Sequence, residues 1–216
     1  ALAAGELQLG ALNPQSLANA VLTAKLDDLR AIVQVLTSDY PGYTGGQFWC
    51  RAPIATAEDM KGKTIAVNAR GSAPDAALRA HLAKHGIKDG EYQTVEMPFP
   101  ATLPAILSKK VDCAVLVAPW QFEMEGKPDY KKIFALADVL GPSESAVWTG
   151  KADWIAKNRA VLVDFVEDHL RFRRWTLDPK TQPDAAKLAA RHDKQPVEKL
   201  SWIFTTRDNY HEPNGR

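Results

Sequence analysis

The chain has 216 residues, of which 45% are hydrophobic and 25% are charged, a balance typical of a globular protein that excludes disordered, collagen-like and disulfide-scaffold chains. The 27 lysine and arginine residues nearly cancel the 26 aspartate and glutamate residues, which leaves a net charge of +1. This neutrality argues against nucleic acid or an anionic membrane surface as the partner. The length accommodates one large domain or two small ones.

Short apolar runs alternate with helical patterns along the first two thirds of the chain, which predicts an α/β fold of parallel strands covered by helices. Several runs are uninterrupted, as in strands buried on both faces of a parallel sheet. The longest uncharged apolar run, at 114–122, is too short to cross a bilayer. The expected strands lie at 7–12, 31–36, 47–51, 64–67, 93–96, 112–117, 133–136 and 146–149.

Two serines are expected to begin helices. Ser16 can cap a helix that runs to residue 25. Ser72 can cap a second helix, with Asp75 in the reciprocal capping position and Gly86 as the left-handed terminator. We expect this second helix to be the best-defined one in the chain.

After Gly150 the strand signals nearly vanish, and 153–177 carries an apolar stripe at helical spacing, which predicts a helical C-terminal third.

Both ends of the sequence resemble interrupted elements. At the N-terminal end, the strand expected at 7–12 needs a parallel neighbour that no earlier residue supplies. We therefore expect that an N-terminal strand–helix–strand unit is missing and that 208–216 precedes a further helix.

Residue types that carry chemistry are sparse. Cys50 and Cys113 are too few for a disulfide framework, and their spacing leaves open whether they pair. His81 and His85 have the spacing of two metal ligands on a helix, but the glutamate of the zincin pattern does not follow His81. Neither a phosphate-binding glycine loop nor a Gly-x-Ser-x-Gly elbow occurs. We expect no metal, no cofactor and no catalysis.

Three stretches of sequence occur in a distinctive order: AAGELQLG at 3–10, DMKGKTIAVN at 59–68 followed by Gly71 and Ser72, and ILSKKVDCAV at 106–115. Together they resemble the solute-binding proteins of ABC importers. More narrowly, they are similar to the family that includes the sulfonate, taurine, nitrate and thiamine-precursor binding proteins. The resemblance covers essentially the whole chain, and it depends on the order of the stretches more than on any one of them.

The resemblance implies a two-lobed periplasmic-binding-protein fold of the type II kind, with the ligand in the cleft between two α/β lobes. Lobe one would be 1–52 and 128–216, and lobe two would be 53–127. The strands that cross between the lobes would lie near 46–50 and 131–135. The missing N-terminal unit would belong to lobe one and would normally line the cleft.

The resemblance also implies a function. The chain would be a monomeric receptor, periplasmic or lipid-anchored outside the cytoplasm, that captures a small organic anion and delivers it to the permease subunits of an ABC importer. A sulfonate or carboxylate, alkyl or aromatic, would be the ligand. Two alternatives remain open: a ligand-sensing module of a signalling protein, and an enzyme similar to the fungal thiamine-pyrimidine synthases, whose cysteine-rich iron motif this chain lacks.

Ligands of open α/β sheets bind beyond the carboxyl ends of strands, so the loops that follow strands are the candidate site. The loop before Ser16 can hold an anion on free helix N–H groups, or Ser16 simply caps its helix. In the next loop Arg70 can pair with an anionic group or point to solvent, while Asp75 counts against an anion lying directly on this turn. Trp120 can stack on a ring or pack between helices. The expected ligand-binding residues are Asn13, Gln15, Ser16, Tyr43, Thr44, Arg70, Gly71, Ser72, Pro119, Trp120 and Ser145.

Overall fold

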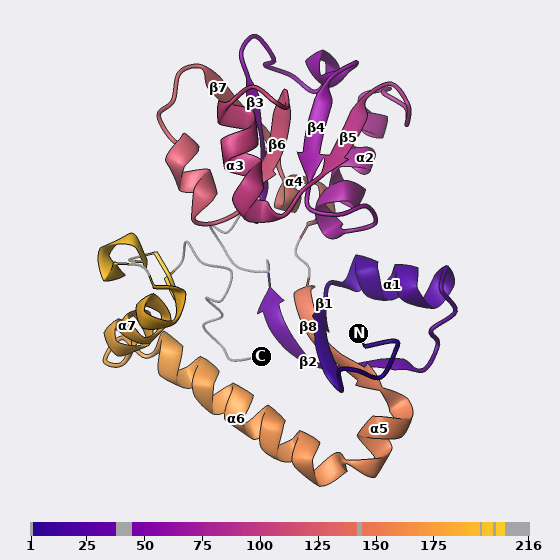
Figure 1. Ribbon diagram of the computed structural model, residues 1–216, viewed down its shortest axis with the longest axis vertical. Coiled ribbons are helices and arrows are strands. Elements are labelled where there is room, and N and C mark those ends of the chain that lie inside the picture. Colours follow the sequence, from indigo (N-terminus) through magenta and orange to yellow (C-terminus); the bar gives the residue numbers. More distant parts are fainter. Residues whose placement is uncertain (1, 38–44, 142–143, 195, 201, 206–216) are drawn as a thin grey trace. The chain divides into compact units, whose positions relative to one another are not determined.

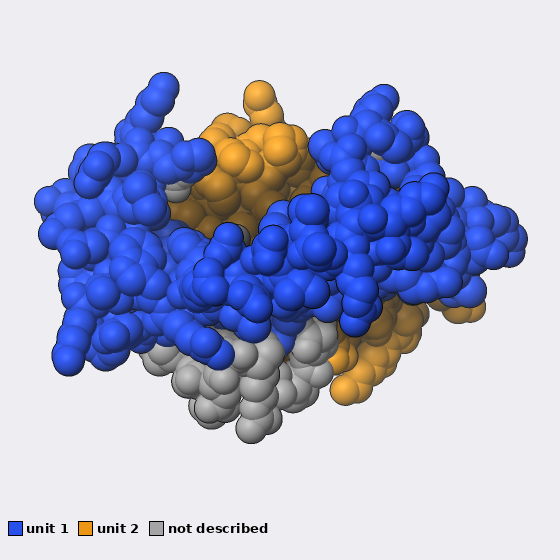
Figure 2. Space-filling view, turned by 90° about the horizontal axis from the view of Figure 1, so that it is seen from below, with its two compact units in different colours: residues 1–43, 143–216 blue, residues 44–142 orange. Residues whose placement is uncertain are grey.

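The computed structural model describes residues 2–37, 45–141, 144–194, 196–200 and 202–205. The chain divides into two compact units, which Figure 2 shows in different colours. Unit 1 consists of Ala1–Tyr43 and Ser143–Arg216, and unit 2 of Thr44–Pro142. None of the described helices is long and apolar enough to cross a membrane.

Unit 1 contains a three-stranded antiparallel sheet (Figure 1), in which β8 (Glu144–Lys151) lies between β1 (Leu9–Leu12) and β2 (Leu29–Thr37). The strand β1 stands at the edge of this sheet as described and pairs on its other side with β8, antiparallel, so the parallel neighbour expected for it stays a prediction. Residues about 135 positions later in the chain supply its partner, and the register places Leu12 opposite Val147. Only the order of strands in space, which the sequence pattern does not contain, could have shown this.

The helices of unit 1 are α1 (Pro14–Leu22), α5 (Ala152–Lys157), α6 (Arg159–Leu177) and α7 (Gln182–Asp193), followed by the 3₁₀ turn η3 (Val197–Leu200). The helical C-terminal third is confirmed, although the helix expected at 153–177 is divided at Asn158. The cap expected at Ser16 was wrong by three residues. Asn13 is the N-cap, because Pro14 has no N–H to satisfy and favours the first helical position.

Unit 2 is built on a five-stranded sheet (Figure 1) with the order β5 (Gln93–Glu96), β4 (Thr64–Val67), β6 (Cys113–Leu116), β3 (Gln47–Arg51), β7 (Tyr130–Ala135). The strand β4 is parallel to β5 and β6, whereas β3 is antiparallel to β6 and β7. The sheet is therefore mixed rather than all-parallel. Both β3 and β7 pair with other strands of this sheet. The residues expected to cross between lobes, 46–50 and 131–135, therefore belong to unit 2. The unit boundaries consequently lie outside the expected 53–127.

The helices of unit 2 are α2 (Ala73–Lys84), α3 (Phe99–Leu107) and α4 (Leu136–Leu140), with the 3₁₀ turns η1 (Glu58–Met60) and η2 (Trp120–Met124). For α2 the predicted boundaries are confirmed. Ser72 is the N-cap, and Gly86 follows the helix with a φ of +77°, which glycine adopts at little cost.

The hydrophobic core of unit 2 has two layers because neighbouring residues of a strand point to opposite faces of a sheet. Phe48 and Cys50 of β3 join the first cluster, which α2 covers with Leu78 and Leu82. Trp49 joins the second cluster, which α3 covers with residues that include Leu103 and Ile106. In unit 1, α1 and α5 contain no buried residue.

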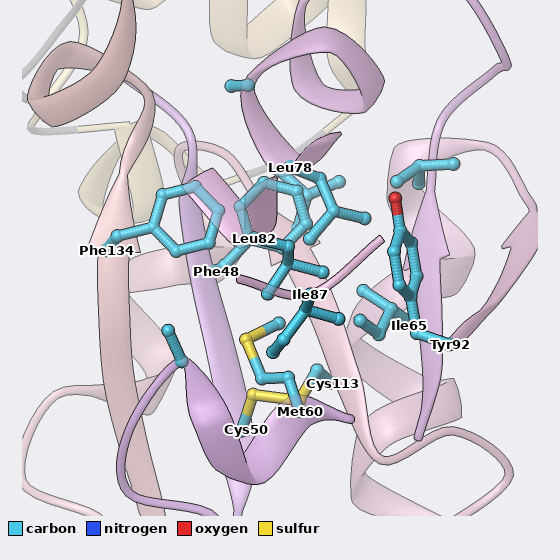
Figure 3. Close-up of a cluster of buried hydrophobic side chains, with 14 of the residues drawn as sticks. Phe48, Cys50, Met60, Ile65, Leu78, Leu82, Ile87, Tyr92, Cys113 and Phe134 are labelled. Atoms are coloured by element: carbon cyan, nitrogen blue, oxygen red, sulfur yellow. A yellow bond between two sulfur atoms is a disulfide. The ribbon is translucent and has the colours of Figure 1, made fainter. Parts of the chain in front are cut away.

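Cys50 and Cys113 form a disulfide inside the first cluster of unit 2. The two residues lie opposite each other on β3 and β6, with their Cα atoms 4.0 Å apart, and both are fully buried. Figure 3 shows the disulfide at one end of the cluster, with Phe48 and Phe134 stacked at the other end. The sequence left this pairing open, and the antiparallel register of two strands distant in the chain decides it.

Candidate functional site

Three loops meet at one edge of the sheet in unit 2. The strands β5, β4 and β6 are neighbours and run parallel, so their carboxyl ends lie at the same edge, where ligands of such sheets bind. The loop after β4 contains Arg70, Gly71 and Ser72, and the loop after β6 contains Pro119 and Trp120. The five predicted residues that the structure describes in unit 2 therefore follow strands that end at the same edge of the sheet.

The loop after β4 is closed by hydrogen bonds of its own. The Ser72 Oγ donates toward Asn68 Oδ1 at 2.8 Å and Ala69 O at 2.7 Å, and it accepts from Asp75 N at 3.4 Å. The Gly71 N–H donates to Asp75 Oδ2 at 2.9 Å. Ser72 is only 4% exposed. Its hydroxyl therefore holds the turn and is already fully used.

Few N–H groups remain free at the start of α2. Arg70 N donates to Glu96 Oε2 at 3.1 Å, and Ser72 N donates to Ala69 O at 3.4 Å. Pro74 has no N–H, and the carboxylate of Asp75, 2% exposed, puts a negative charge into the first turn. Among residues 70–76, all of which the structure describes, Ala73 N is the only N–H without a partner. This helix start is consequently a poor place for an anion.

The two arginines beside this loop are engaged in ion pairs. Arg70 is exposed, with its Nε 3.4 Å from Glu96 Oε1. The Arg79 Nε lies 3.1 Å from Asp75 Oδ2, and its Nη1 lies 2.5 Å from Asp89 Oδ2. Both arginines line a cavity of about 580 Å³ in unit 2. The other residues that line it are Asp89, Gly90, Tyr92, Gln93 and Thr94.

Tyr92 belongs to the same network of polar contacts. Its hydroxyl donates to Asp89 Oδ1 at 2.9 Å. Burial, followed by this hydrogen bond, raises the pKa of Tyr92 to about 12. The tyrosine therefore stays neutral, and it links the 88–92 turn through Asp89 and Arg79 to the start of α2.

The same edge carries apolar side chains that the sequence reasoning missed. Met97 and Phe99 follow β5 directly and are half-buried, as is Trp120 after β6. Met97 and Trp120 pack against the second core cluster, and Phe99 packs against the first. The strand at 93–96 was predicted correctly, so the rule of carboxyl ends applied to it would have found both residues.

In unit 1 the start of α1 is more open. Asn13 Oδ1 accepts from Ser16 N at 2.7 Å, and Asn13 O accepts from Leu17 N at 3.0 Å. In the part of the chain that the structure describes, Gln15 N, the Gln15 side chain and Ser16 Oγ have no hydrogen-bond partner. The first turn contains no acidic residue. Free donors and the positive end of the helix dipole therefore coincide here.

The remaining predicted residues cannot be placed in a site. Tyr43 and Thr44 lie outside the described residues. Ser145 belongs to β8, but its side chain lies outside the description.

His81 and His85 do meet on α2, with their ring centres 4.8 Å apart. The His85 Nδ1 lies 2.7 Å from Glu58 Oε1, and the His81 ring stacks on Phe134 at 3.9 Å. Burial, followed by the charge of His85, lowers the pKa of His81. A search of the described residues found no group of three or more histidine, cysteine or acidic residues able to hold a metal ion.

Comparison with known proteins identifies the fold. Residues 50–190, more than half of the chain, match the NMT1-like family. A search of curated proteins gave no match. Solved structures resemble the chain over most of its length, at identities that establish the fold alone.

Three of these structures are named for the sulfonate or nitrate that they bind. The alkanesulfonate-binding protein SsuA from Xanthomonas axonopodis pv. citri, bound to MOPS, has a TM-score of 0.76 and 17% identity, over 96% of this chain and 69% of its own. The aliphatic sulphonate binding protein SsuA from Escherichia coli has a TM-score of 0.71 and 18% identity, over 96% and 68%. The nitrate-binding protein NrtA from Synechocystis PCC 6803 has a TM-score of 0.68 and 11% identity, over 91% and 55%. The chain thus spans only part of its neighbours' length, and it belongs to the NMT1-like family, with the α/β fold of the periplasmic solute-binding proteins of ABC importers.

Proposed function

We propose that this chain is the solute-binding receptor of an ABC importer, which captures a small organic anion between its two lobes and delivers it to the permease subunits. Membership of the NMT1-like family and the sulfonate- and nitrate-binding neighbours support this proposal. The observation that carries it is the start of α1, where Gln15 N and Ser16 Oγ have no partner among the described residues and the first turn contains no carboxylate.

The proposed ligand has a charged end and an organic end. A sulfonate or carboxylate head group would bind at α1, because helix N-termini favour anions. The organic part would contact Met97, Phe99 and Trp120 of unit 2, which are apolar and half-buried. A ligand stabilises a closed form only through the contacts it gains there, so residues of both units must contribute.

The disulfide bears on the location and the partners of the protein. Disulfides persist in oxidising compartments and are rare in the cytosol, and Cys50 and Cys113 are bonded within a core cluster. This supports a periplasmic or lipid-anchored location outside the cytoplasm, where the receptor would meet its permease as a monomer.

A thermal-shift screen of the purified full-length protein tests the proposal, since a ligand that binds only the folded state raises its Tm. The panel contains small sulfonates, aliphatic and aromatic carboxylates, nitrate and pyrimidines. We expect one saturable class of organic anion, recovered unchanged after dialysis. Recovery of an altered compound would instead support a thiamine-pyrimidine-synthase-like enzyme, and a panel without any shift would reject the receptor.

A further inference from the structure

Gln121 stands apart from the other buried polar residues. The described residues contain seven buried polar or charged side chains, among which Gln121 is 5% exposed. Its Oε1 is buried without a hydrogen-bond partner, and no hydrogen bond of its side chain is found within the described residues. A buried polar group without a partner loses its hydration and gains nothing in return.

The other six buried polar side chains show what is normal in this chain. Ser72 and Asp75 bond within the loop after β4, and Thr102 Oγ1 donates to Phe99 O at 2.7 Å. The remaining three, Thr149, Arg173 and Thr176, also have interaction partners. Native proteins pair nearly all such groups. Packing alone therefore does not explain a glutamine at position 121, where an apolar side chain of similar length would avoid the cost.

The position of Gln121 relates it to the candidate site. It lies in η2, directly after Trp120, and its own N–H donates to Val117 O at 3.1 Å, which fixes its backbone at the carboxyl end of β6. This is the sheet edge at which the strands β4 and β5 also end.

We propose that Gln121 is a specificity-determining residue, which hydrogen-bonds a polar substituent that the solute carries in addition to its anionic group. This inference rests on the proposed function. It adds to it that the solute is not a simple alkyl anion but bears an amine, ammonium or hydroxyl group.

The chemistry of this edge selects a hydrogen-bond donor on the solute. The unpaired buried atom of Gln121 is a carbonyl oxygen, and Asp75 Oδ1 in the loop after β4 is a second buried acceptor without a partner. Nearly all N–H donors of residues 70–76 are already used within the protein. This edge of unit 2 thus offers acceptors rather than donors.

Matched ligands and variants test the assignment. The ligands are two pairs that differ only by an amino group in place of a methyl group: 2-aminoethanesulfonate with 1-propanesulfonate, and 3-aminopropanoate with butanoate. The variants of the full-length protein are Gln121→Met, which keeps the length of the side chain, and Thr102→Val as the control, a buried polar residue whose bond is satisfied within α3. Kd is measured by calorimetry and Tm by thermal unfolding.

We expect the native protein to bind the amino member of at least one pair tenfold or more tightly than its methyl partner. Gln121→Met should abolish this preference and leave Tm unchanged or higher, whereas Thr102→Val should lower Tm and keep the preference. Binding of any ligand without an amino preference, or a preference that survives in Gln121→Met, would overturn the role of Gln121 and leave the receptor intact. Failure of all four ligands together with a hit elsewhere in the thermal-shift panel would overturn the inference and leave the receptor intact, whereas a panel without any hit would reject both.

Discussion

The starts of α1 and α2 look alike in sequence and differ in what they leave free. Each has an N-cap residue that accepts from the backbone N–H three residues later and a proline in the first turn. In α2, however, Asp75 occupies the Gly71 N–H and brings a buried carboxylate, whereas the first turn of α1 has no acidic residue. A capping motif thus marks the start of a helix, but only the count of unused donors shows whether an anion can bind there.

The largest expected effect concerns the stability of unit 2, which contains α2. Replacing both cysteines, Cys50→Ala with Cys113→Ala, opens a loop of 63 residues, and chain-entropy arguments give a loss of about 4 kcal/mol in the free energy of unfolding. Urea denaturation measures the loss, and addition of reductant to the native protein is the control. An unchanged midpoint in both experiments would show that the disulfide does not hold unit 2 together.

The second expected effect tests the carboxylate that distinguishes α2. Asp75→Ala removes the acceptor of Gly71 N and of Arg79 Nε, and we expect it to destabilise the protein by about 2 to 3 kcal/mol, because both donors lose the charged partner that the buried carboxylate provides. Asp184→Ala is the control. Asp184 also lies in the first turn of a helix, but it is exposed and paired with Lys187, so its loss should cost under about 0.5 kcal/mol. Equal denaturation midpoints for the two variants would contradict the role given to Asp75.

The third prediction compares the same substitution, serine to alanine, at the starts of α2 and α1. Ser72→Ala should lower the stability by about 1 kcal/mol, since it removes a cap, and should leave ligand affinity nearly unchanged. Ser16→Ala should do the reverse, weakening the affinity for an organic anion by roughly tenfold, about 1.4 kcal/mol, at unchanged Tm. Calorimetry and thermal unfolding of both variants measure this. If Ser72→Ala weakens the ligand affinity and Ser16→Ala lowers only the stability, the comparison of free donors at the two helix starts is wrong.

The smallest expected effect lies toward the other end of α2. The pKa of His81 is lowered from its ordinary 6.5, chiefly by burial, so on acidification the unfolded chain takes up this proton before the folded one. Stability should therefore fall modestly as the pH drops below about 6.5, toward the lowered pKa. His81→Gln should flatten this part of the profile, measured by urea denaturation between pH 8 and pH 5. His192→Gln, on the exposed side of α7, is the matched control variant.

Local patterns in the sequence were sufficient for most of the fold. All eight expected strands exist, and 47–51, 64–67 and 93–96 have the predicted bounds, because short apolar runs between turn residues leave little freedom in placing them. The signal for the true cap of α1 was also present, since Asn13 stands before Pro14. The partner of β1 and the pairing of Cys50 with Cys113 depend instead on which distant strands become neighbours.

The site was less predictable for a related reason. The sequence shows that Ser72 and Gln121 follow strands, but not that the hydroxyl of Ser72 is fully used while the amide of Gln121 is not. Whether a polar group is free depends on the atoms packed around it, and several elements supply these. The free donors near Ser16 could be predicted from residue types, whereas the unpaired state of the Gln121 oxygen could not.

The disulfide between β3 and β6 also determines how the chain would behave after cleavage. Cys50 and Cys113 enclose β4, α2, β5 and α3 in a covalent ring. A protease that cuts the chain once between these cysteines would leave both fragments joined, and a gel run without reductant would show a single band at the original mass. Two fragments would separate only after reduction, so resistance to nicking can be judged correctly only when both gels are compared.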